Sequence, residues 1–275
     1  MRKSISVWWY SQTGSAYLCG QTAAEVLQDE GWTVRWQSLL KDDFNNDDSD
    51  ALLLAFPVHN FQVPVSIARR LQAMAKLPAR RPAWALITYA GWAANTPWQV
   101  RRLLKQKNID LENYALVKCR DSYIPFVKWL PFLNETGKPD QASLATVKKF
   151  VKTQIVSPGK RRRIFFNPLD PMHWAGFFSP AKGPKWFLGK RIFVAEDCVA
   201  CGQCAALCPS GALTMEDNRP VYADKKCLGC CGCMNICPQN AWRSSWFGPE
   251  YYNKGLKVGA MVKTLTERHS LGQPK

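Results

Sequence analysis

Two neighbouring stretches decide how this chain folds: CVACGQCAALCP at residues 198–209 and CLGCCGCMNICP at residues 227–238. Both have the spacing C-x2-C-x2-C-x3-C-P, and the second begins 29 residues after the first, so they form an internal repeat. Nine of the 11 cysteines in this 275-residue chain lie in the repeat. A disulfide framework needs an oxidising compartment, which nothing else in the sequence indicates. The repeat therefore predicts thiolates that bind metal.

The spacing resembles that of bacterial ferredoxins with two 4Fe-4S clusters, in which three cysteines of each run bind one cluster and the fourth binds the other cluster. The resemblance implies one ligand set of Cys198, Cys201, Cys204 and Cys237, and another of Cys227, Cys230, Cys233 and Cys208. It also places the fourth cysteine of each run at the start of a helix. Zinc is the alternative metal for these thiolates.

Three cysteines lie outside this pattern. Cys231 stands between two expected ligands and is interpreted as a small spacer, with an alternative ligand or redox thiol as the other interpretation. Cys19 and Cys119 are interpreted as packing residues of a helix and a strand. Between the two runs, residues 211–215 and 219–222 predict a short hairpin.

The first 155 residues alternate strand-prone and helix-prone segments. An apolar stripe at Leu18, Thr22 and Val26, beside Cys19, Ala23 and Leu27, predicts a first helix. The expected strands are residues 4–10, 33–38, 51–56, 83–89 and 114–119, and the further helices are residues 65–76, 97–107 and 141–155. This alternation predicts a parallel sheet covered on both faces. Five strands suit a doubly wound, flavodoxin-type order, which binds its ligand at the carboxyl ends of the strands.

The loop after the first strand reads Ser11-Gln12-Thr13-Gly14-Ser15-Ala16. It lacks the glycine pattern of dinucleotide folds and the Gly-Lys of phosphate loops, and its hydroxyl and N–H groups at a helix start suit a phosphate monoester. It resembles the S/T-x-T-G-x-T loop of the flavodoxins at five of six positions, which implies FMN. Ala16 lacks the last hydroxyl, which is expected to weaken FMN by about one to two powers of ten.

Two further loops resemble those that flank the flavin ring in flavodoxin-like proteins. The first contributes Pro57, Val58, His59, Asn60 and Phe61, and the second contributes Tyr89, Ala90, Gly91 and Trp92. The resemblance implies stacking by Trp92, Tyr89 or Phe61 and backbone N–H contacts near Asn60 and Gly91. Ordinary packing of the aromatic residues, and a surface position for His59, are the alternatives.

The whole chain is similar to the flavodoxin-ferredoxin fusion family of bacterial and archaeal electron carriers. The family pattern implies a flavodoxin-like domain at residues 1–156, a basic and aromatic connector at 157–191, and a small α+β two-cluster ferredoxin domain with a C-terminal extension at 192–275. Asp121-Ser122-Tyr123-Ile124-Pro125 resembles the Asp-Asn-Tyr stretch of that family. The resemblance implies an electron carrier in which two clusters exchange electrons with FMN.

Two other functions remain open. An FMN-dependent oxidoreductase would reduce a small molecule or quinone, although the sequence contains no acid–base pair or pyridine-nucleotide fingerprint that supports it. A ferredoxin with a flavin-free docking domain is the other alternative.

The formal net charge is +16. Residues 151–193 hold nine basic residues against one acid, Asp170, with interleaved aromatic residues and prolines that are expected to prevent regular structure. This connector is expected to attract an acidic redox protein or electron-accepting enzyme, or alternatively an anionic membrane face. Another interpretation is that its aromatic residues seal a domain interface. No nucleic-acid-binding signature is present.

No apolar run approaches the roughly 18 residues that a membrane span needs. The beginning of the sequence does not resemble a secretion signal. A cytoplasmic protein is therefore expected. The sequence does not indicate the physiological donor, the acceptor or the oligomeric state.

Overall fold

The computed structural model describes residues 3–123, 137–157, 159–178 and 192–244, together with residues 259, 261 and 263. The chain divides into two compact units. The first consists of Met1–Ser11, Ser15–Arg120 and Glu135–Phe178, and the second of Gln12–Gly14, Asp121–Asn134 and Ser179–Lys275. Part of the expected connector therefore belongs to the first unit.

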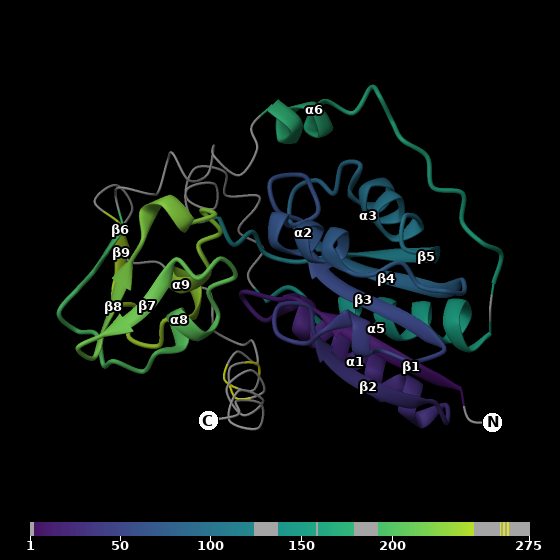
Figure 1. Ribbon diagram of the computed structural model, residues 1–275, viewed down its shortest axis with the longest axis horizontal. Coiled ribbons are helices and arrows are strands. Elements are labelled where there is room, and N and C mark those ends of the chain that lie inside the picture. The colour runs from purple at the N-terminus through teal and green to yellow at the C-terminus, as the bar shows by residue number, and fades with distance from the viewer. Residues whose placement is uncertain are drawn as a thin grey trace. The chain divides into compact units, whose positions relative to one another are not determined.

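The first unit is built on a sheet of five parallel strands (Figure 1). They are β1 (Ser4–Trp9), β2 (Thr33–Ser38), β3 (Ala51–Pro57), β4 (Arg81–Tyr89) and β5 (Ile109–Lys118). Their order, β2-β1-β3-β4-β5, is that of flavodoxin-type doubly wound folds. The strand order reverses between β1 and β3, because β2 lies on one side of β1 and β3 on the other. Doubly wound folds bind ligands at the carboxyl ends of the strands at such a switch point, which is where the loops after β1 and β3 begin. The predicted fold class is confirmed.

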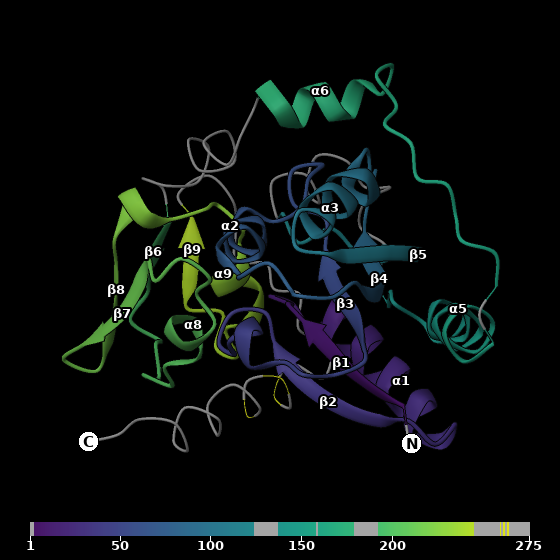
Figure 2. The ribbon, with the colours of Figure 1, turned by 45° about the vertical axis from the view of Figure 1, so that its right-hand side comes forward.

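Helices cover both faces of this sheet. They are α1 (Ser15–Asp29), α2 (Val65–Ala73), α3 (Thr96–Lys105) and α5 (Gln141–Val151), the last extended by the π-helical turn η3 (Lys152–Val156). α1 contacts α5, and α2 contacts α3. Figures 1 and 2 show the two pairs on opposite faces. Because both faces are covered, residues 51–56 of β3 are apolar and buried without alternation.

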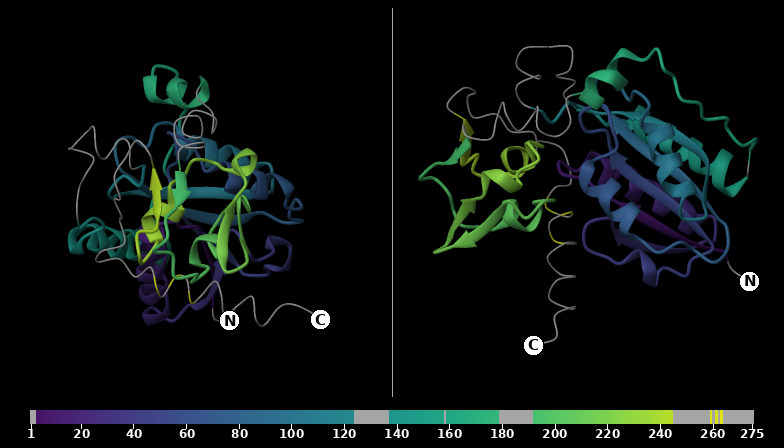
Figure 3. Two further views of the ribbon diagram at one scale, coloured as in Figure 1. Left: turned by 90° about the vertical axis from the view of Figure 1, so that its left-hand side faces the viewer. Right: turned by 45° about the horizontal axis from the view of Figure 1, so that its top comes forward.

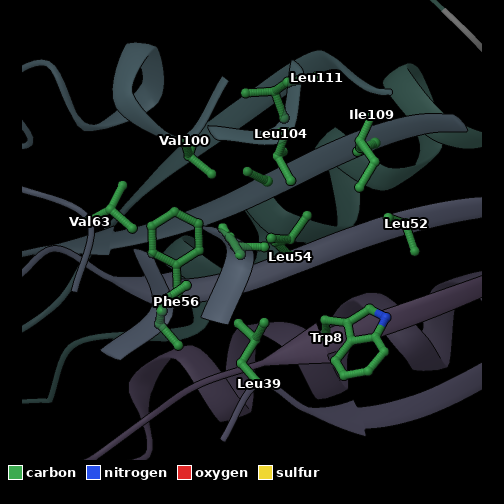
Figure 4. Close-up of a cluster of buried hydrophobic side chains, with 14 of the residues drawn as sticks. Trp8, Leu39, Leu52, Leu54, Phe56, Val63, Val100, Leu104, Ile109 and Leu111 are labelled. Carbon is green, nitrogen blue, oxygen red and sulfur yellow. The ribbon is translucent and has the colours of Figure 1, made fainter. Parts of the chain in front are cut away.

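An apolar cluster fills the space between the sheet and helices α2 and α3 (Figure 4). Trp8 and Phe56 enter it from strands, and Val100 and Leu104 enter it from α3. The ring of Trp8 stacks on Phe44, with 3.9 Å between the ring centroids. Phe44 belongs to the same cluster and lies in the short 3-10 helix η1 (Phe44–Asn46).

β5 begins at Ile109, five residues before the expected strand. Its first half alternates the buried residues Ile109 and Leu111 with the partly exposed residues Asp110 and Glu112. Such alternation is typical of a strand with one buried face. The two acidic residues interrupt the apolar run, so the start of the strand was not predicted.

Residues 160–170, called the strap below, run along the first unit towards α6 (Pro171–Phe178) (Figure 2). Near its start, Arg161 forms ion pairs with Asp110 at 3.4 Å and with Glu112 at 3.3 Å. The guanidinium of Arg162 lies 4.5 Å from the centre of the Tyr114 ring. The acidic side chains of β5 therefore hold the beginning of the strap.

Hydrogen bonds from α3 and the loop before it hold the rest of the strap. Arg101 donates to the carbonyl of Ile164 at 2.8 Å, and the Ile164 side chain is buried in the apolar cluster. The amide of Asn95 donates to the Asn167 carbonyl at 2.8 Å and accepts the Asn167 N–H at 2.9 Å. These bonds make the strap an ordered part of the first unit.

α6 contradicts the expectation that prolines prevent regular structure throughout the connector. Pro171 is the first residue of this helix, where the fixed φ and missing N–H of proline are favourable. The Asp170 carboxylate accepts the N–H groups of Met172 at 2.9 Å and His173 at 3.2 Å. Proline therefore begins a capped helix here instead of breaking one.

The second unit contains two small antiparallel pairs (Figure 3). β6 (Ile192–Val194) pairs with β9 (Trp242–Ser244), and β7 (Leu213–Glu216) pairs with β8 (Arg219–Tyr222), which confirms the predicted hairpin. The short elements between them are α8 (Gln203–Ala206), η5 (Asp224–Lys226) and α9 (Gly232–Ile236). Leu213, Met234 and Trp242 form the core with Cys231.

Within the described part of the chain, no helix has the length and apolar character needed to cross a membrane.

A buried carboxylate joins three parts of the first unit. Asp47 accepts hydrogen bonds from the Ser6 hydroxyl at 3.0 Å, the Trp8 indole and the Ser49 N–H at 2.9 Å. The guanidinium of Arg81 lies 3.6 Å from the same carboxylate and also donates to the Asp47 carbonyl at 2.9 Å. Removing the carboxylate would leave several buried donors without an acceptor.

We expect Asp47→Ala to destabilise the protein by about 3 kcal/mol, because the buried partners of Asp47 would lose their acceptor. Urea denaturation followed by far-UV circular dichroism measures this change. Asp48→Ala is the matched control, since Asp48 pairs with Arg35 on the surface and should change the midpoint little. Equal effects of the two substitutions would contradict a structural role specific to Asp47.

Candidate functional site

Two hollows in the second unit are each lined by one predicted cysteine quartet. The smaller, of about 350 Å³ including its open mouth, is lined by Cys198, Cys201, Cys204 and Cys237. The larger, of about 520 Å³ on the same measure, is lined by Cys208, Cys227, Cys230 and Cys233, and also by Cys204 and Cys231. The structure therefore brings together both sets of cysteines that the sequence predicts, including the exchange of the fourth cysteine.

The backbone of the two runs repeats with the same 29-residue offset as the sequence. Left-handed residues occur in pairs: Ala200 and Gly229, Gly202 and Cys231, and Gly211 and Asn240. The sulfur of the fourth cysteine in each run also lies near a backbone N–H group at the equivalent position. The N–H of Ala212 lies 3.2 Å from Cys208 Sγ, and the N–H of Ala241 lies 3.2 Å from Cys237 Sγ. The two hollows are thus built by equivalent backbone conformations.

The fourth cysteine of each run does not begin a helix, contrary to expectation. The third cysteines, Cys204 and Cys233, lie inside α8 and α9, and Cys237 caps the carboxyl end of α9. Cys208 follows the capping residue of α8. Each helix begins after a left-handed residue at its amino end, and the proline after each fourth cysteine disfavours its continuation.

Burial shifts the acidity of several thiols in these hollows. It raises the pKa of Cys230 to about 12, raises the pKa of Cys233 well above its usual value and also raises that of Cys204. Thiols with raised pKa values stay protonated at neutral pH unless a metal centre compensates their charge, so binding would release protons. Soft thiolate quartets fit an iron–sulfur cluster. Among the described residues, no group of three or more His, Cys, Asp or Glu has the geometry of a site for a single metal ion.

The remaining cysteines are buried. Cys231 lies in the core of the second unit with φ at 56°, in the position that Gly202 occupies in the first run. Cys19 and Cys119 are also buried, and burial raises the pKa of Cys19 to about 12. These positions fit packing and do not call for a redox role.

The loop after β1 provides buried polar groups at a helix start. Ser11 and Ser15 are buried, and α1 begins at Ser15 directly after Gly14, whose φ is 96°. Gln12 and Thr13 are also buried, but they are grouped with Gly14 in the second unit. The Ser15 hydroxyl has no hydrogen-bond partner within the described part of the chain. The first N–H groups of a helix also have no intrahelical partner, so this loop fits an anionic group such as a phosphate. The side chain of Ala16, the last residue of the loop, is 1% exposed.

The loop after β3 forms a strained two-residue turn. His59 and Gln62 exchange backbone hydrogen bonds of 3.0 and 2.9 Å, and Asn60 and Phe61 between them have φ values of 47° and 61°. A phenylalanine in this left-handed region costs about 1–2 kcal/mol, so surrounding contacts must hold it. One such contact is the hydroxyl of Thr96, which donates to the Phe61 carbonyl at 3.4 Å. The turn has the fixed shape expected of a ligand-binding loop.

The loops after β3 and β4 lie side by side because Pro57 and Thr88 are register partners in adjacent strands. The Val58 N–H donates to the Thr88 carbonyl at 2.8 Å. Ala90 and Gly91 follow directly after β4.

The three expected stacking residues differ in availability. Trp92 is 51% exposed, whereas Phe61 is partly buried within its turn. The Lys118 ammonium lies 5.3 Å from the centre of the Tyr89 ring. Trp92 is therefore the most accessible of the three for a planar ligand.

α6 contacts the turn after β3, which sequence analysis missed. A Cβ on Gly176 would lie 2.6 Å from the Asn60 carbonyl oxygen, so the helix can approach this closely only with glycine at that position. The Asp170-Pro171 pair is the sequence signal for this helix. The connector thereby supports one of the candidate ligand loops.

Asp121, Ser122 and Tyr123 belong to the second unit. The Ser122 carbonyl accepts the buried Asn235 amide at 2.8 Å, and Tyr123 packs on the core. Burial raises the pKa of both Asp121 and Tyr123. Ile124 and Pro125, the last residues of this stretch, lie outside the described residues.

His59 lies at the start of the strained turn, edge-on to Tyr10 with 5.8 Å between the ring centroids. His59 is half-buried, and desolvation lowers its pKa from 6.5 to about 4, so its imidazole is neutral at pH 7. The unfolded chain takes up this proton near pH 6.5, but the folded protein does so only near pH 4. The contribution of His59 to the free energy of unfolding is therefore fully present above about pH 6.5 and is lost as the pH falls towards 4.

We expect an imidazole resonance that titrates near pH 4 in NMR spectra of the full chain. The chain has three histidines, so its absence from the His59→Gln spectrum assigns it. The variant should also lose less stability than the wild type between pH 6.5 and 4. A His59 titration near pH 6.5 would show that the site is hydrated and would refute this prediction.

The family model of a 4Fe-4S dicluster domain matches residues 190–238, which confirms an iron–sulfur domain there. No curated protein has a significant match to the chain.

Solved flavodoxins match the amino-terminal half. A flavodoxin from the Archaea has 11% identity and a TM-score of 0.38 over 54% of this chain and 93% of its own. A short-chain flavodoxin associated with a PDU bacterial microcompartment has 11% identity and a TM-score of 0.43 over 57% and 99%. Flavodoxin 1 from Bacillus cereus has 9% identity and a TM-score of 0.41 over 55% and 95%. The fold assignment rests on the strand order and not on these weak likenesses. The chain joins a doubly wound unit with the flavodoxin strand order to a 4Fe-4S dicluster domain at residues 190–238.

Proposed function

We propose that this protein is an electron carrier that relays electrons between two 4Fe-4S clusters and an FMN. The observation that carries the proposal is the pair of equivalent hollows, each lined by a quartet that takes its fourth cysteine from the other run. Iron–sulfur clusters exchange single electrons and FMN accepts two, so the combination would couple one-electron donors to a two-electron step.

The second unit contributes the cluster ligands and their surroundings. Cys198, Cys201, Cys204 and Cys237 would hold one cluster, and Cys208, Cys227, Cys230 and Cys233 the other. Backbone N–H groups that already point at cysteine sulfur include those of Ala212, Gly229 and Ala241. Such donors stabilise negative charge on the sulfur and therefore raise the reduction potential.

The loops of the doubly wound fold would bind FMN. Residues 11–16 would hold the phosphate with the hydroxyl of Ser15 and the N–H groups of α1. The turn at residues 59–62 and the loop at 88–92 would flank the ring, with Trp92 as the accessible aromatic side chain. The neutral imidazole of His59 would add no positive charge beside the ring at pH 7.

The direct test is anaerobic purification of the full chain, with iron, acid-labile sulfide and FMN counted per chain. About eight iron atoms and one FMN are expected. Reductive titration should then consume about four electrons per chain, two in the clusters and two in the flavin. Eight iron atoms with no FMN, even after added flavin, would reject the relay and select a ferredoxin with a flavin-free docking domain. Sustained turnover of a small molecule or quinone without another protein would instead select an oxidoreductase.

An acidic redox protein or electron-accepting enzyme in the cytoplasm is the partner class we propose. Thiolates, cluster cores and an FMN phosphate would lower the formal charge of +16 to about +10, so the holoprotein stays basic. Charge complementarity would speed its encounter with an acidic partner, and added salt would slow it.

Substitution of Cys231 separates packing from ligation. We expect Cys231→Gly to keep the full iron content, because Gly202 occupies the equivalent left-handed position in the first run. Cys230→Ala, the matched control, should lose about half of the iron, because it removes one cysteine of a single quartet. Iron analysis of both variants after identical reconstitution gives the comparison. Loss of half the iron from Cys231→Gly would identify Cys231 as a ligand.

Substitution of Gly176 tests the support of the flavin loop. In Gly176→Ala, the new methyl group would push α6 away from the Asn60 carbonyl and release the strained turn. We expect FMN to bind about tenfold more weakly, as measured by ultrafiltration of free flavin. Gly159→Ala is the control, since its methyl group meets mainly the flexible side chain of Gln154. Unchanged FMN affinity in Gly176→Ala would show that α6 does not act on the flavin loop.

A further inference from the structure

An aromatic surface is exposed at the end of the strap and on α6. Within the described residues, half of the large hydrophobic side chains that are exposed belong to residues 165–178. They are Phe165, Leu169, Trp174, Phe177 and Phe178. The ring centroid of Phe178 lies 5.3 Å from that of Phe177 and 6.1 Å from that of Trp174. These side chains form a cluster, unlike the scattered apolar residues of an ordinary protein surface.

The opposite side of α6 is fixed to the first unit. His173 is buried and lies edge-on to Phe166 at 5.0 Å, and Gly176 lies against the Asn60 carbonyl. The Trp174 indole N–H donates to the Pro168 carbonyl at 2.7 Å, which satisfies the polar atom of that side chain. α6 therefore presents apolar rings outward from a defined support.

The strap that leads to α6 carries mostly positive charge. Residues 160–163 are Lys-Arg-Arg-Arg, and the one acid in residues 160–178 is Asp170. The Asp170 carboxylate accepts the N–H groups at the start of α6. Arg161 is held by acidic residues of β5, whereas Lys160 and Arg163 are exposed. Residues 160–178 thus combine exposed rings on α6 with exposed cations near the start of the strap, and their one carboxylate, Asp170, caps α6.

We propose that residues 160–178 form an interfacial patch that binds the surface of an anionic phospholipid bilayer. Trp174, Phe177 and Phe178 enter the boundary between headgroups and acyl chains, and Lys160 and Arg163 meet the headgroup phosphates. An acidic protein surface would match the cations but would leave the rings, which are up to 76% exposed, without an apolar partner. A bilayer surface satisfies both requirements.

The length of α6 agrees with this mode of binding. Its eight residues extend for about 12 Å, which is far less than the hydrocarbon thickness of a bilayer. The helix would therefore lie in the interface and not cross it. This inference does not depend on the proposed electron relay, although it would bring the relay close to a membrane-bound redox partner.

Sedimentation of the full-length holoprotein with vesicles tests the proposal. Vesicles of phosphatidylcholine and phosphatidylglycerol in equal parts are compared with vesicles of phosphatidylcholine alone. We expect binding to the anionic vesicles that weakens at high salt. The variant Trp174→Ser/Phe177→Ser/Phe178→Ser should bind at least tenfold more weakly, and Lys160→Gln/Arg163→Gln should bind on the order of tenfold more weakly.

Phe193→Ser/Val221→Ser is the matched control, because it removes exposed apolar side chains from the second unit and should bind as the wild type does. Unchanged circular dichroism and iron content verify that each variant is folded. The proposal is overturned if the wild type does not sediment with anionic vesicles or if the triple variant sediments equally well. It is also overturned if the wild type binds immobilised polyglutamate but not the vesicles, since that result assigns the surface to an acidic polypeptide.

Discussion

The exchange of cysteines between the two runs is the constraint on which the second unit depends. Each run lines its own hollow with three cysteines and reaches the other hollow with its fourth. Neither run can complete a quartet alone. The second run, which begins only 29 residues after the first, must therefore lie beside it. The β7–β8 hairpin makes this return, and β6 pairs with β9 to bring the two ends together. The small core of Leu213, Met234 and Trp242 packs inside this closed path.

The first unit depends on a different constraint, because its candidate ligand loops need external support. The left-handed Phe61 makes the turn after β3 unfavourable in isolation. Thr96 holds the Phe61 carbonyl, and α6 packs on the neighbouring Asn60. Asn95, next to Thr96, holds the strap through Asn167. Asn95 and Thr96, which are adjacent at the start of α3, therefore hold both the loop and the strap. A change in the strap is expected to alter the position of the loop.

Periodicity and spacing predicted the parts of the structure that follow from local patterns. The buried runs in β1 and β3, and the alternation of strands with helices, were sufficient for the sheet and its order. The resemblance of the cysteine spacing to that of two-cluster ferredoxins implied the two quartets that line the hollows. The start of β5 was missed because Asp110 and Glu112 interrupt its apolar pattern, and their tertiary partner is the distant Arg161. α6 was missed because proline was interpreted as a breaker, whereas the effect of Pro171 depends on its position within the helix.

The arginines of the strap show why composition alone did not identify a binding surface. Their charge suggested docking to an acidic partner, but Arg161 already has two carboxylate partners on β5, and Arg162 lies over Tyr114. These contacts satisfy the charges within the chain and fix the strap in place. The strap in turn presents α6 with His173 buried and Phe178 exposed. Part of the positive charge of the strap is therefore used in contacts within the first unit. The side chains of residues 160–178 that remain exposed are aromatic as well as basic. The proposed partner therefore provides an apolar region as well as negative charge.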